Sequence, residues 1–334
     1  MKTLEKIAFV LRKDQTDYLE LAQAIQDYES LVFALSTIEI ENESNREDIH
    51  FDTGKALGTT WAALCIRDLI RTKIFIKGLF NAIEQVKKTK QGSVNVLYAG
   101  TGPFATLILP VMATYSEAEV QFTLLEVNKV SFDTVNQVIN KLGFGGYIKA
   151  STNEDATKYV VNSDHHIDIV VSETMQQGLK REQQVPIVLN IMRQVKKEVI
   201  LIPEKITLDV CLMNFTKLHA REKNTEEEYC IRLGAFFELS REKIKEYELS
   251  SHLENGKLLF PQKSINLKME DLKEFNQLAV LTEIQVFGED KISINESGLT
   301  IPLILEDLSA HQKGLTLNIR YAVSEEPGIE YSWI

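Results

Sequence analysis

Two short stretches of the chain carry residues whose types and spacing could do chemistry. The first, VNVLYAGTGPFAT, places Gly100, Thr101 and Gly102 directly after an apolar run. Glycines at such a turn let the backbone approach a ligand closely, and a helix that begins there offers unpaired N–H groups and a positive dipole end. The second stretch, SETMQQGLKRE, carries Glu173 and Glu182 nine residues apart. The first suggests a nucleotide pocket, and the second suggests acidic groups that act in it.

A third acid strengthens the nucleotide interpretation. Glu126 closes the apolar run VQFTLLE, 24 residues after Gly102, where a carboxylate can accept hydrogen bonds from both ribose hydroxyls. Dinucleotide oxidoreductases and S-adenosylmethionine enzymes both use such a pair, and a tight turn that binds no ligand is the alternative to both. Hydride transfer would not need Glu173 and Glu182. These two acids have their own alternative, a solvated charge followed by an acid at a helix start.

Short apolar runs that alternate with helical patterns must position these groups. Such alternation predicts βαβ units and a parallel, doubly wound sheet. Glu173 would then lie outside the carboxyl edge of the sheet, near the point where the strand order reverses. The expected strands are residues 94–98, 120–126, a short strand at 147–148, 166–173 and 198–203.

The regions before and after this sheet have different patterns of apolar residues. Apolar residues at helical spacing predict helices over 14–35 and 59–89, and another over 103–115 with Pro103 in its first turn. After Pro203, β-rich runs separated by charged or glycine-containing turns predict an antiparallel sheet or barrel.

These patterns predict an α/β fold in three parts. A helical segment spans 1–90, a Rossmann-like doubly wound domain that binds the cofactor spans 91–203, and an antiparallel, β-barrel-like domain for substrate or oligomerisation spans 204–334.

Composition excludes several classes of protein. A formal net charge of -11 argues against nucleic-acid binding, which needs a basic surface. Cys65, Cys211 and Cys230 are too few and too scattered for a disulfide framework or a zinc site, so no metal is expected. No apolar run is long enough to span a membrane, and the N-terminus lacks the apolar core of a signal peptide. We therefore expect a cytoplasmic protein.

In their order along residues 60–310, these motifs resemble the protein arginine methyltransferases, which are class I S-adenosylmethionine-dependent enzymes. In that family a strand ending in Ser-Glu opens a loop with two acids at the spacing of Glu173 and Glu182. The stretch DLIRTKIF resembles the family's Asp-x-x-Arg-Thr helix, YAGTGPFA its glycine motif, and ILIPEKITLDV its entry into the barrel.

The resemblance implies S-adenosyl-L-methionine as cofactor and a role for each motif. Arg71 would hold the methionine carboxylate, and Glu126 would be the ribose acid. Glu173 and Glu182 would orient a cationic nitrogen for methyl transfer. Residues on two further loops are also implied: Asn153 and Glu154 lie where an adenine-amine contact would come, and Met175 would pack beside the sulfonium.

The chain departs from the family pattern in four places. Tyr98-Ala99 stands where the family shows an acid before its glycines, and HFDTGKALGTTW has no clear Tyr-Phe helix. Glu296-Ser297-Gly298 replaces the Thr-His-Trp loop, and residues 214–229 are short for a dimerisation arm, so a homodimer stays an open expectation.

Three interpretations remain. The first is a methyltransferase acting on a guanidinium or other nitrogen of a protein, peptide or small molecule. The second is the same fold methylating an unrelated small molecule. The third is a non-catalytic scaffold that keeps the cofactor pocket, with a nicotinamide dehydrogenase as a distant fourth.

Overall fold

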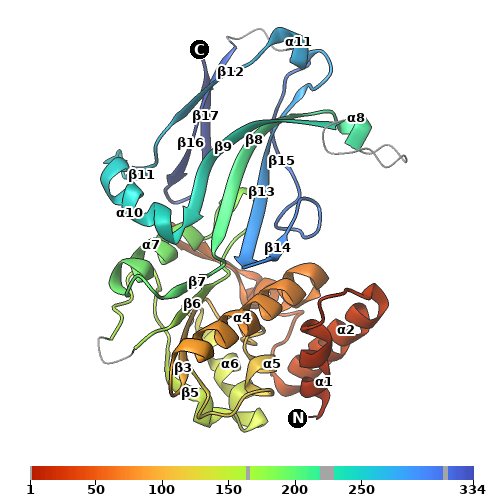
Figure 1. Cartoon of the computed structure of the whole chain (residues 1–334), viewed down its shortest axis with the longest axis vertical. Helices are drawn as coiled ribbons and strands as arrows, with labels where there is room; N and C mark the ends of the chain where they lie inside the picture. The colour runs from red at the N-terminus through yellow and green to blue at the C-terminus, as the bar shows by residue number, and fades with distance from the viewer. Residues whose placement is uncertain (1, 163–165, 219–228, 311–314) are drawn as a thin grey trace.

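The computed structural model describes residues 2–162, 166–218, 229–310 and 315–334. An α/β part with the N-terminal helices lies at one end of the molecule, and a β-rich part lies at the other (Figure 1). One continuous hydrophobic core contains buried side chains from both parts, from Leu4 near the N-terminus to Tyr321 in a late strand.

The α/β part is built on a five-stranded sheet in the order β5-β4-β3-β6-β7. Every neighbouring pair of strands is parallel. The doubly wound sheet predicted from the alternating pattern is therefore confirmed. The strands are β3 (Val94–Ala99), β4 (Val120–Leu125), β5 (Ile148–Thr152), β6 (Ile169–Ser172) and β7 (Ile200–Ile202).

Helix α6 (Lys129–Leu142) has a capping residue at each end. The Asn128 side chain accepts hydrogen bonds from the backbone N–H groups of Val130 and Ser131 and so caps the helix start. Gly143 ends the helix in the left-handed conformation, with φ of 75°. Helix α7 (Gln184–Gln194) follows the loop that carries the two glutamates.

Two helix predictions are wrong in detail. The expected helix over 103–115 shrinks to α5 (Leu109–Met112), because Gly102 and Ala105 have positive φ and interrupt right-handed helix geometry. The expected helix over 59–89 divides into α3 (Thr59–Leu64), a 3-10 turn (Cys65–Arg67) and α4 (Leu69–Thr89). Asp68 causes the break, since its carboxylate accepts the N–H of Arg71 and starts a new helix.

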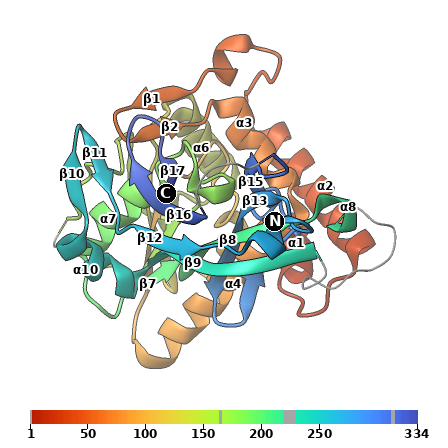
Figure 2. The ribbon, with the colours of Figure 1, turned by 90° about the horizontal axis from the view of Figure 1, so that it is seen from above.

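The N-terminal segment contains more structure than its sequence indicates. Helices α1 (Lys2–Leu11) and α2 (Tyr18–Leu35) pack against each other, and α10 (Arg241–Ser250) lies on the opposite side of the molecule in both views (Figures 1 and 2). The polar stretch between α2 and α3 forms a two-stranded antiparallel hairpin, β1 (Ile49–Phe51) and β2 (Gly54–Ala56).

The β-rich part consists of two antiparallel sheets. One contains β8 (Lys205–Met213), β9 (Cys230–Ser240), β13 (Gln277–Phe287), β14 (Asp290–Ile292) and β15 (Leu303–Asp307). The other contains β10 (His252–Glu254), β11 (Lys257–Leu259), β12 (Lys263–Asn266), β16 (Thr316–Val323) and β17 (Gly328–Trp333). Three helices accompany them: α8 (Phe215–Leu218), α10 (Arg241–Ser250) and α11 (Met269–Leu272).

The antiparallel prediction for this part is confirmed, but within the described residues neither sheet closes into a barrel. The change from parallel to antiparallel strands falls between Ile202 and Lys205. The division into domains at residues 90 and 203 stays a prediction. Most of the segment 214–229, considered above as a dimerisation arm, lies outside the described residues.

No helix in the described part of the chain is long and apolar enough to cross a membrane. The same residues contain no group of three or more His, Cys, Asp or Glu side chains placed to hold a metal ion.

Candidate active site

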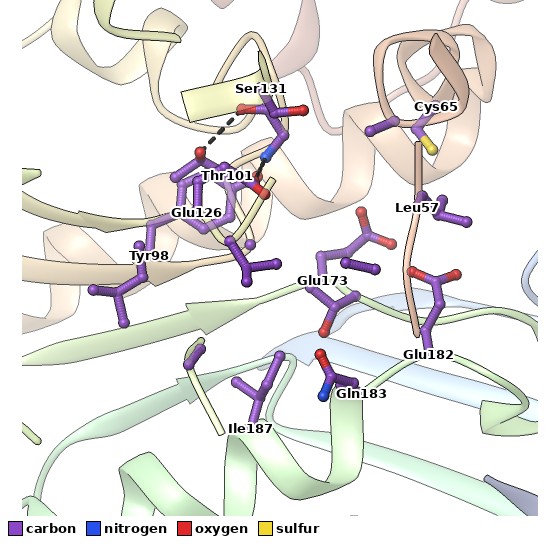
Figure 3. A pocket seen from close by; sticks show the side chains of 18 of the residues that line it. Leu57, Cys65, Tyr98, Thr101, Glu126, Ser131, Glu173, Glu182, Gln183 and Ile187 are labelled. Atoms are coloured by element: carbon purple, nitrogen blue, oxygen red, sulfur yellow. Dashed lines mark hydrogen bonds between the residues drawn. The ribbon is translucent and has the colours of Figure 1, made fainter. Parts of the chain in front are cut away.

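The candidate site is a pocket at the carboxyl edge of the parallel sheet (Figure 3). Three strands deliver residues to it as they end: β3 is followed by Gly100, β4 by Glu126 and β6 by Glu173. The chain leaves β3 toward β4 on one side, and β6 pairs with β3 on the other, so this is the position where doubly wound sheets bind ligands. The pocket encloses about 980 Å³ of empty space, a volume that includes the open solvent at its mouth.

Left-handed glycines shape the turn after β3. Gly100 and Gly102 have φ of +75° and +61°, a region that residues with a Cβ rarely adopt. A Cβ on Gly100 would lie 2.2 Å from Cγ2 of Thr174, so the turn packs directly on the loop after β6. A Cβ on Gly102 would meet only the Ala62 Cβ, at 3.8 Å, and its absence leaves room at the pocket wall. Thr101 between them is buried and also lines the pocket.

Glu126 is held against this turn by backbone donors. Its Oε2 accepts the N–H of Gly102 at 2.7 Å, and its Oε1 accepts the N–H of Asn128 at 2.8 Å. Burial raises the pKa of Glu126 to about 6, although these N–H groups oppose the rise. The acid and the glycine turn therefore form one unit at the pocket wall.

Arg71 and Glu173 form a short ion pair. The Arg71 Nη2 lies 2.5 Å from Glu173 Oε2, and the two side chains are only 14% and 9% exposed. Burial raises the pKa of Glu173, and Arg71 opposes that rise. Burial alone would lower the pKa of Arg71, but the Glu173 carboxylate reverses this effect and raises it. The guanidinium therefore stays charged.

Glu182 enters the same pocket from the far end of the loop. Burial raises the pKa of Glu182 to about 7, with Arg71 opposing the rise and Glu173 adding to it. Both carboxylates point toward one space (Figure 3). The Oε1 atom of each is buried and has no hydrogen-bond partner among the described residues. A buried carboxylate oxygen without a donor is costly, and a ligand that donates N–H groups would satisfy both.

The loop between the two glutamates is held in an unusual backbone conformation. Leu179 and Arg181 have positive φ, of 54° and 67°, which is strained for side chains with a Cβ. Distant elements keep this conformation: the Tyr321 hydroxyl of β16 donates to the Leu179 carbonyl at 2.7 Å, and the Lys55 N–H of β2 donates to the Arg181 carbonyl at 2.8 Å. The β-rich part, through β16, and the β1–β2 hairpin, through Lys55, thus help to position Glu182.

The remaining predicted site residues are less central. Glu154 is exposed and lines the pocket. The Asn153 amide instead donates to the carbonyls of Glu126 and Val127, at 2.7 and 2.9 Å, and the residue does not line the pocket. Met175 is buried outside the pocket wall.

Several residues around the site were not predicted from the sequence. Lys55, Cys65, Tyr98 and Ser131 line the pocket. Only Tyr98 had a signal, as a departure from the family pattern. Burial raises the pKa of both the Cys65 thiol and the Tyr98 hydroxyl, so both groups are neutral at pH 7.

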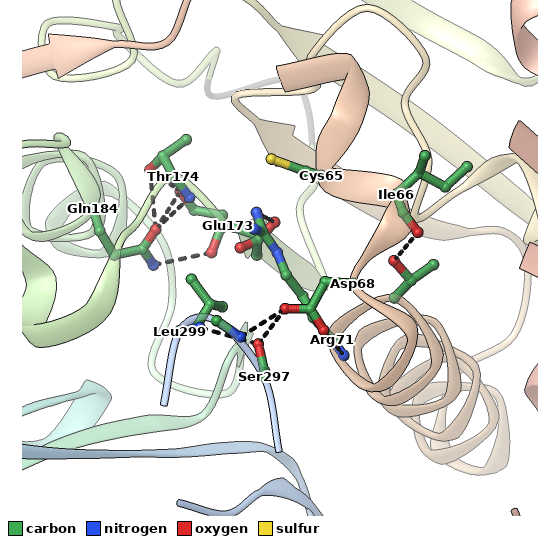
Figure 4. A network of polar contacts seen from close by, with 12 residues as sticks. Cys65, Ile66, Asp68, Arg71, Glu173, Thr174, Gln184, Ser297 and Leu299 are labelled. Atoms are coloured by element: carbon green, nitrogen blue, oxygen red, sulfur yellow. Dashed lines mark hydrogen bonds and ion pairs between the residues drawn. The ribbon is translucent and has the colours of Figure 1, made fainter. Parts of the chain in front are cut away.

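The loop that replaces Thr-His-Trp also lies next to the site (Figure 4). The Ser297 hydroxyl donates to Asp68 Oδ2 at 2.6 Å, and the Gly298 N–H donates to the same oxygen at 2.9 Å. Asp68 caps the helix that carries Arg71, so this loop connects the β-rich part to the first turn of α4.

Solved structures give the comparison with known proteins. A crystal structure of PRMT6, a protein arginine methyltransferase, matches with a TM-score of 0.51 at 13% identity, over 80% of this chain and 97% of that one. The fold resembles that of the protein arginine methyltransferases. A PRMT6 structure with SAH matches with a TM-score of 0.51 at 12% identity, over 81% and 98% of the two chains.

The PRMT1 enzyme–prozyme heterotetrameric complex of Trypanosoma brucei with AdoHcy matches with a TM-score of 0.50 at 12% identity, over 80% of this chain and 91% of that one. No protein-family model and no curated protein matches the sequence. At these identities the likeness establishes the fold.

Proposed function

We propose that this protein is an S-adenosylmethionine-dependent methyltransferase that acts on a cationic nitrogen. One observation carries the proposal: Glu173 and Glu182 each have a buried, unpartnered carboxylate oxygen, and both residues line the pocket that the glycine turn and Glu126 also line. A nucleotide site alone would not need this arrangement.

The cofactor fits the residues at one end of the pocket. The missing side chain of Gly102 leaves room there, and Glu126 retains lone pairs that can accept the ribose hydroxyls. Arg71 would bind the methionine carboxylate, and Glu154 would lie nearest the adenine. Asn153, which does not line the pocket, would support this end of the site through its hydrogen bonds to the carbonyls of Glu126 and Val127, and Met175 would support the loop beside the sulfonium. When bound, S-adenosylmethionine supplies an electrophilic methyl group on a positive sulfur. The similar solved structures that contain AdoHcy or SAH support this assignment.

The acceptor would bind to the two glutamates. Arg71 occupies one oxygen of Glu173 and leaves Oε1 of Glu173 and Oε1 of Glu182 for a ligand. With both acids ionised, the three side chains carry a net charge of -1, which one cation neutralises. Two carboxylate oxygens can bind two N–H groups of a guanidinium and fix its plane. They would also favour the charge on the nitrogens that do not react, so that the attacking nitrogen is the better nucleophile.

The acceptor would be a protein, a peptide or a small molecule with such a nitrogen, and we propose no nucleic-acid partner. The PRMT neighbours favour a protein or peptide, and the heterotetramer among them favours an oligomer such as a homodimer. The Ser297–Gly298 loop in place of Thr-His-Trp favours the small-molecule alternative. We place the enzyme in the cytoplasm, because few and scattered cysteines are typical of a reducing compartment.

Calorimetric titration with S-adenosylhomocysteine and with NAD tests the cofactor. We expect binding of the first only, and tight NAD binding with no heat from S-adenosylhomocysteine would overturn the proposal. Transfer of a labelled methyl group to lysate fractions, separated into proteins and small molecules, then distinguishes the acceptor classes. Binding without any transfer would identify a scaffold.

A further inference from the structure

Gln184 makes hydrogen bonds on both sides of Glu173. It is the first residue of α7 and is 1% exposed. Its Nε2 donates to the Ser172 carbonyl at 2.9 Å, while its Oε1 accepts the Thr174 N–H at 2.9 Å and the Thr174 hydroxyl at 3.0 Å (Figure 4). Ser172 and Thr174 are the two chain neighbours of Glu173, so one side chain clamps the backbone that carries this acid.

The Gln184 side chain holds the backbone at the point where the β-sheet ends. β6 ends at Ser172, so the backbone beyond it has no strand ladder to hold it. The Gln184 amide replaces that ladder with one donor, Nε2, and one acceptor, Oε1, which lie on separate atoms and so reach both neighbours of Glu173. Gln184 also follows Glu182 by two residues, so the same clamp joins the two ends of the acidic loop.

The clamped residue Thr174 also touches the glycine turn. A Cβ on Gly100 would lie 2.2 Å from the Thr174 methyl carbon, so in the native structure this methyl group fills the space that Gly100 leaves open. Gln184 therefore contacts Thr174, and Thr174 contacts Gly100, so a chain of contacts runs from the start of α7 to the turn at the end of β3.

We propose that Gln184 is a positioning residue that sets the Glu173 carboxylate relative to the glycine turn and so relative to the bound cofactor. This inference rests on the proposed function. Because methyl transfer needs donor and acceptor aligned within a fraction of an ångström, loss of the clamp lowers turnover more than it lowers stability.

The test is Gln184→Met, which keeps the length of the side chain and removes both hydrogen-bonding groups. The matched control is Gln194→Met at the other end of α7. The Gln194 amide also accepts a backbone N–H, from Val161, and donates to a backbone carbonyl, of Tyr159, both at 2.9 Å and away from the pocket. Both variants lose a donated and an accepted backbone hydrogen bond from the same helix, although Gln184 is buried and Gln194 is exposed.

We expect kcat of Gln184→Met to fall about 100-fold, the cost of an ångström-scale misplacement, while KM for S-adenosylmethionine rises less than tenfold. Gln194→Met should keep wild-type kcat. Calorimetry with S-adenosylhomocysteine and thermal melting run in parallel. A kcat of Gln184→Met within threefold of the control, at equal Tm, would overturn the inference, as would equal losses in both variants.

Failure of the proposed function gives a different result. A wild-type protein that binds S-adenosylhomocysteine but methylates nothing refutes the methyltransferase activity alone. The clamp is then judged by affinity: Gln184→Met should bind S-adenosylhomocysteine about tenfold more weakly than Gln194→Met, because Thr174 supports the turn, and equal affinities refute it. A wild-type protein that binds none refutes both.

Discussion

Replacing Glu173 with glutamine removes one charge of a buried pair and leaves Arg71 without its directly bonded counter-ion. Arg71 is 14% exposed and Glu173 9%, so solvent screens the pair only weakly. Breaking such a pair costs about 3–5 kcal/mol, and we expect about 3 kcal/mol because the glutamine oxygen can still accept from Arg71. Turnover should fall about 100- to 1,000-fold, the usual effect of losing one electrostatic contact to the reacting groups.

The same substitution should also change the titration of the site. Glu173 is one of the groups that raise the pKa of Glu182, so its neutralisation should lower the pKa of Glu182 below about 7. The assays are urea denaturation, initial rates of methyl transfer and a pH profile of kcat/KM. The matched control is Glu119→Gln, which breaks the Glu119–Lys87 pair at 2.7 Å, where Glu119 is 42% exposed and away from the pocket. The control should cost less than about 1 kcal/mol.

The reasoning fails if Glu173→Gln unfolds at the wild-type urea midpoint and turns over at the wild-type rate. The carboxylate would then neither neutralise Arg71 nor hold the acceptor. Loss of stability without loss of rate would leave Glu173 as a structural partner of Arg71 only.

Three other substitutions or conditions test separate parts of the site. Gly100→Ala should cost about 1–2 kcal/mol for a left-handed residue with a Cβ and about 1–3 kcal/mol for the contact with Thr174, and it should weaken S-adenosylhomocysteine binding. The control Gly92→Ala, at φ +86° with nothing within 4 Å, should show only the first cost. Equal urea midpoints for the two variants would contradict the contact between Gly100 and Thr174. The pKa of Glu182 is raised to about 7, so the contribution of this group to stability is present below about pH 4.5 and is lost as the pH rises through 7, about 3 kcal/mol in all. Over the same pH range kcat/KM should rise, because the ionised carboxylate binds the acceptor. Denaturation and rates measured from pH 5 to 8 check both signs, and a flat rate profile would count against an ionised Glu182. Ser297→Ala removes one donor to Asp68 and should cost about 1 kcal/mol in urea denaturation, with a larger loss meaning that Asp68 depends on Ser297 more than on its backbone donors.

The position of the pocket follows from local sequence patterns. Each strand of the parallel sheet is a short apolar run, and Gly100, Glu126 and Glu173 come directly after such runs. In a doubly wound sheet the carboxyl ends of parallel strands share one edge, so the order of motifs is enough to bring these residues together. The break before α4 was not predicted, although Asp68 is a preferred N-cap residue and is the signal in the sequence that marks it.

The rest of the site depends on contacts between distant segments. The β1–β2 hairpin is too short and polar to show strand periodicity, and it is ordered against the acidic loop through Lys55. The pairing of Arg71 with Glu173 joins residues 102 positions apart, and the link from Ser297 to Asp68 joins residues 229 apart. Gln184 looks like any polar residue at a helix start, because its two backbone partners are defined only by the tertiary fold.

The most direct test of a nitrogen methyltransferase is to identify the atom that receives the methyl group. Wild-type protein, S-adenosylmethionine with a ¹³C-labelled methyl group and the acceptor fraction from the lysate assay are incubated together, and the product is examined by NMR. The account predicts a labelled N-methyl group on a guanidinium or amine, formed at least about 100-fold more slowly when Glu173→Gln replaces the wild type. A label on oxygen, carbon or sulfur, or equal labelling by the variant, would contradict it.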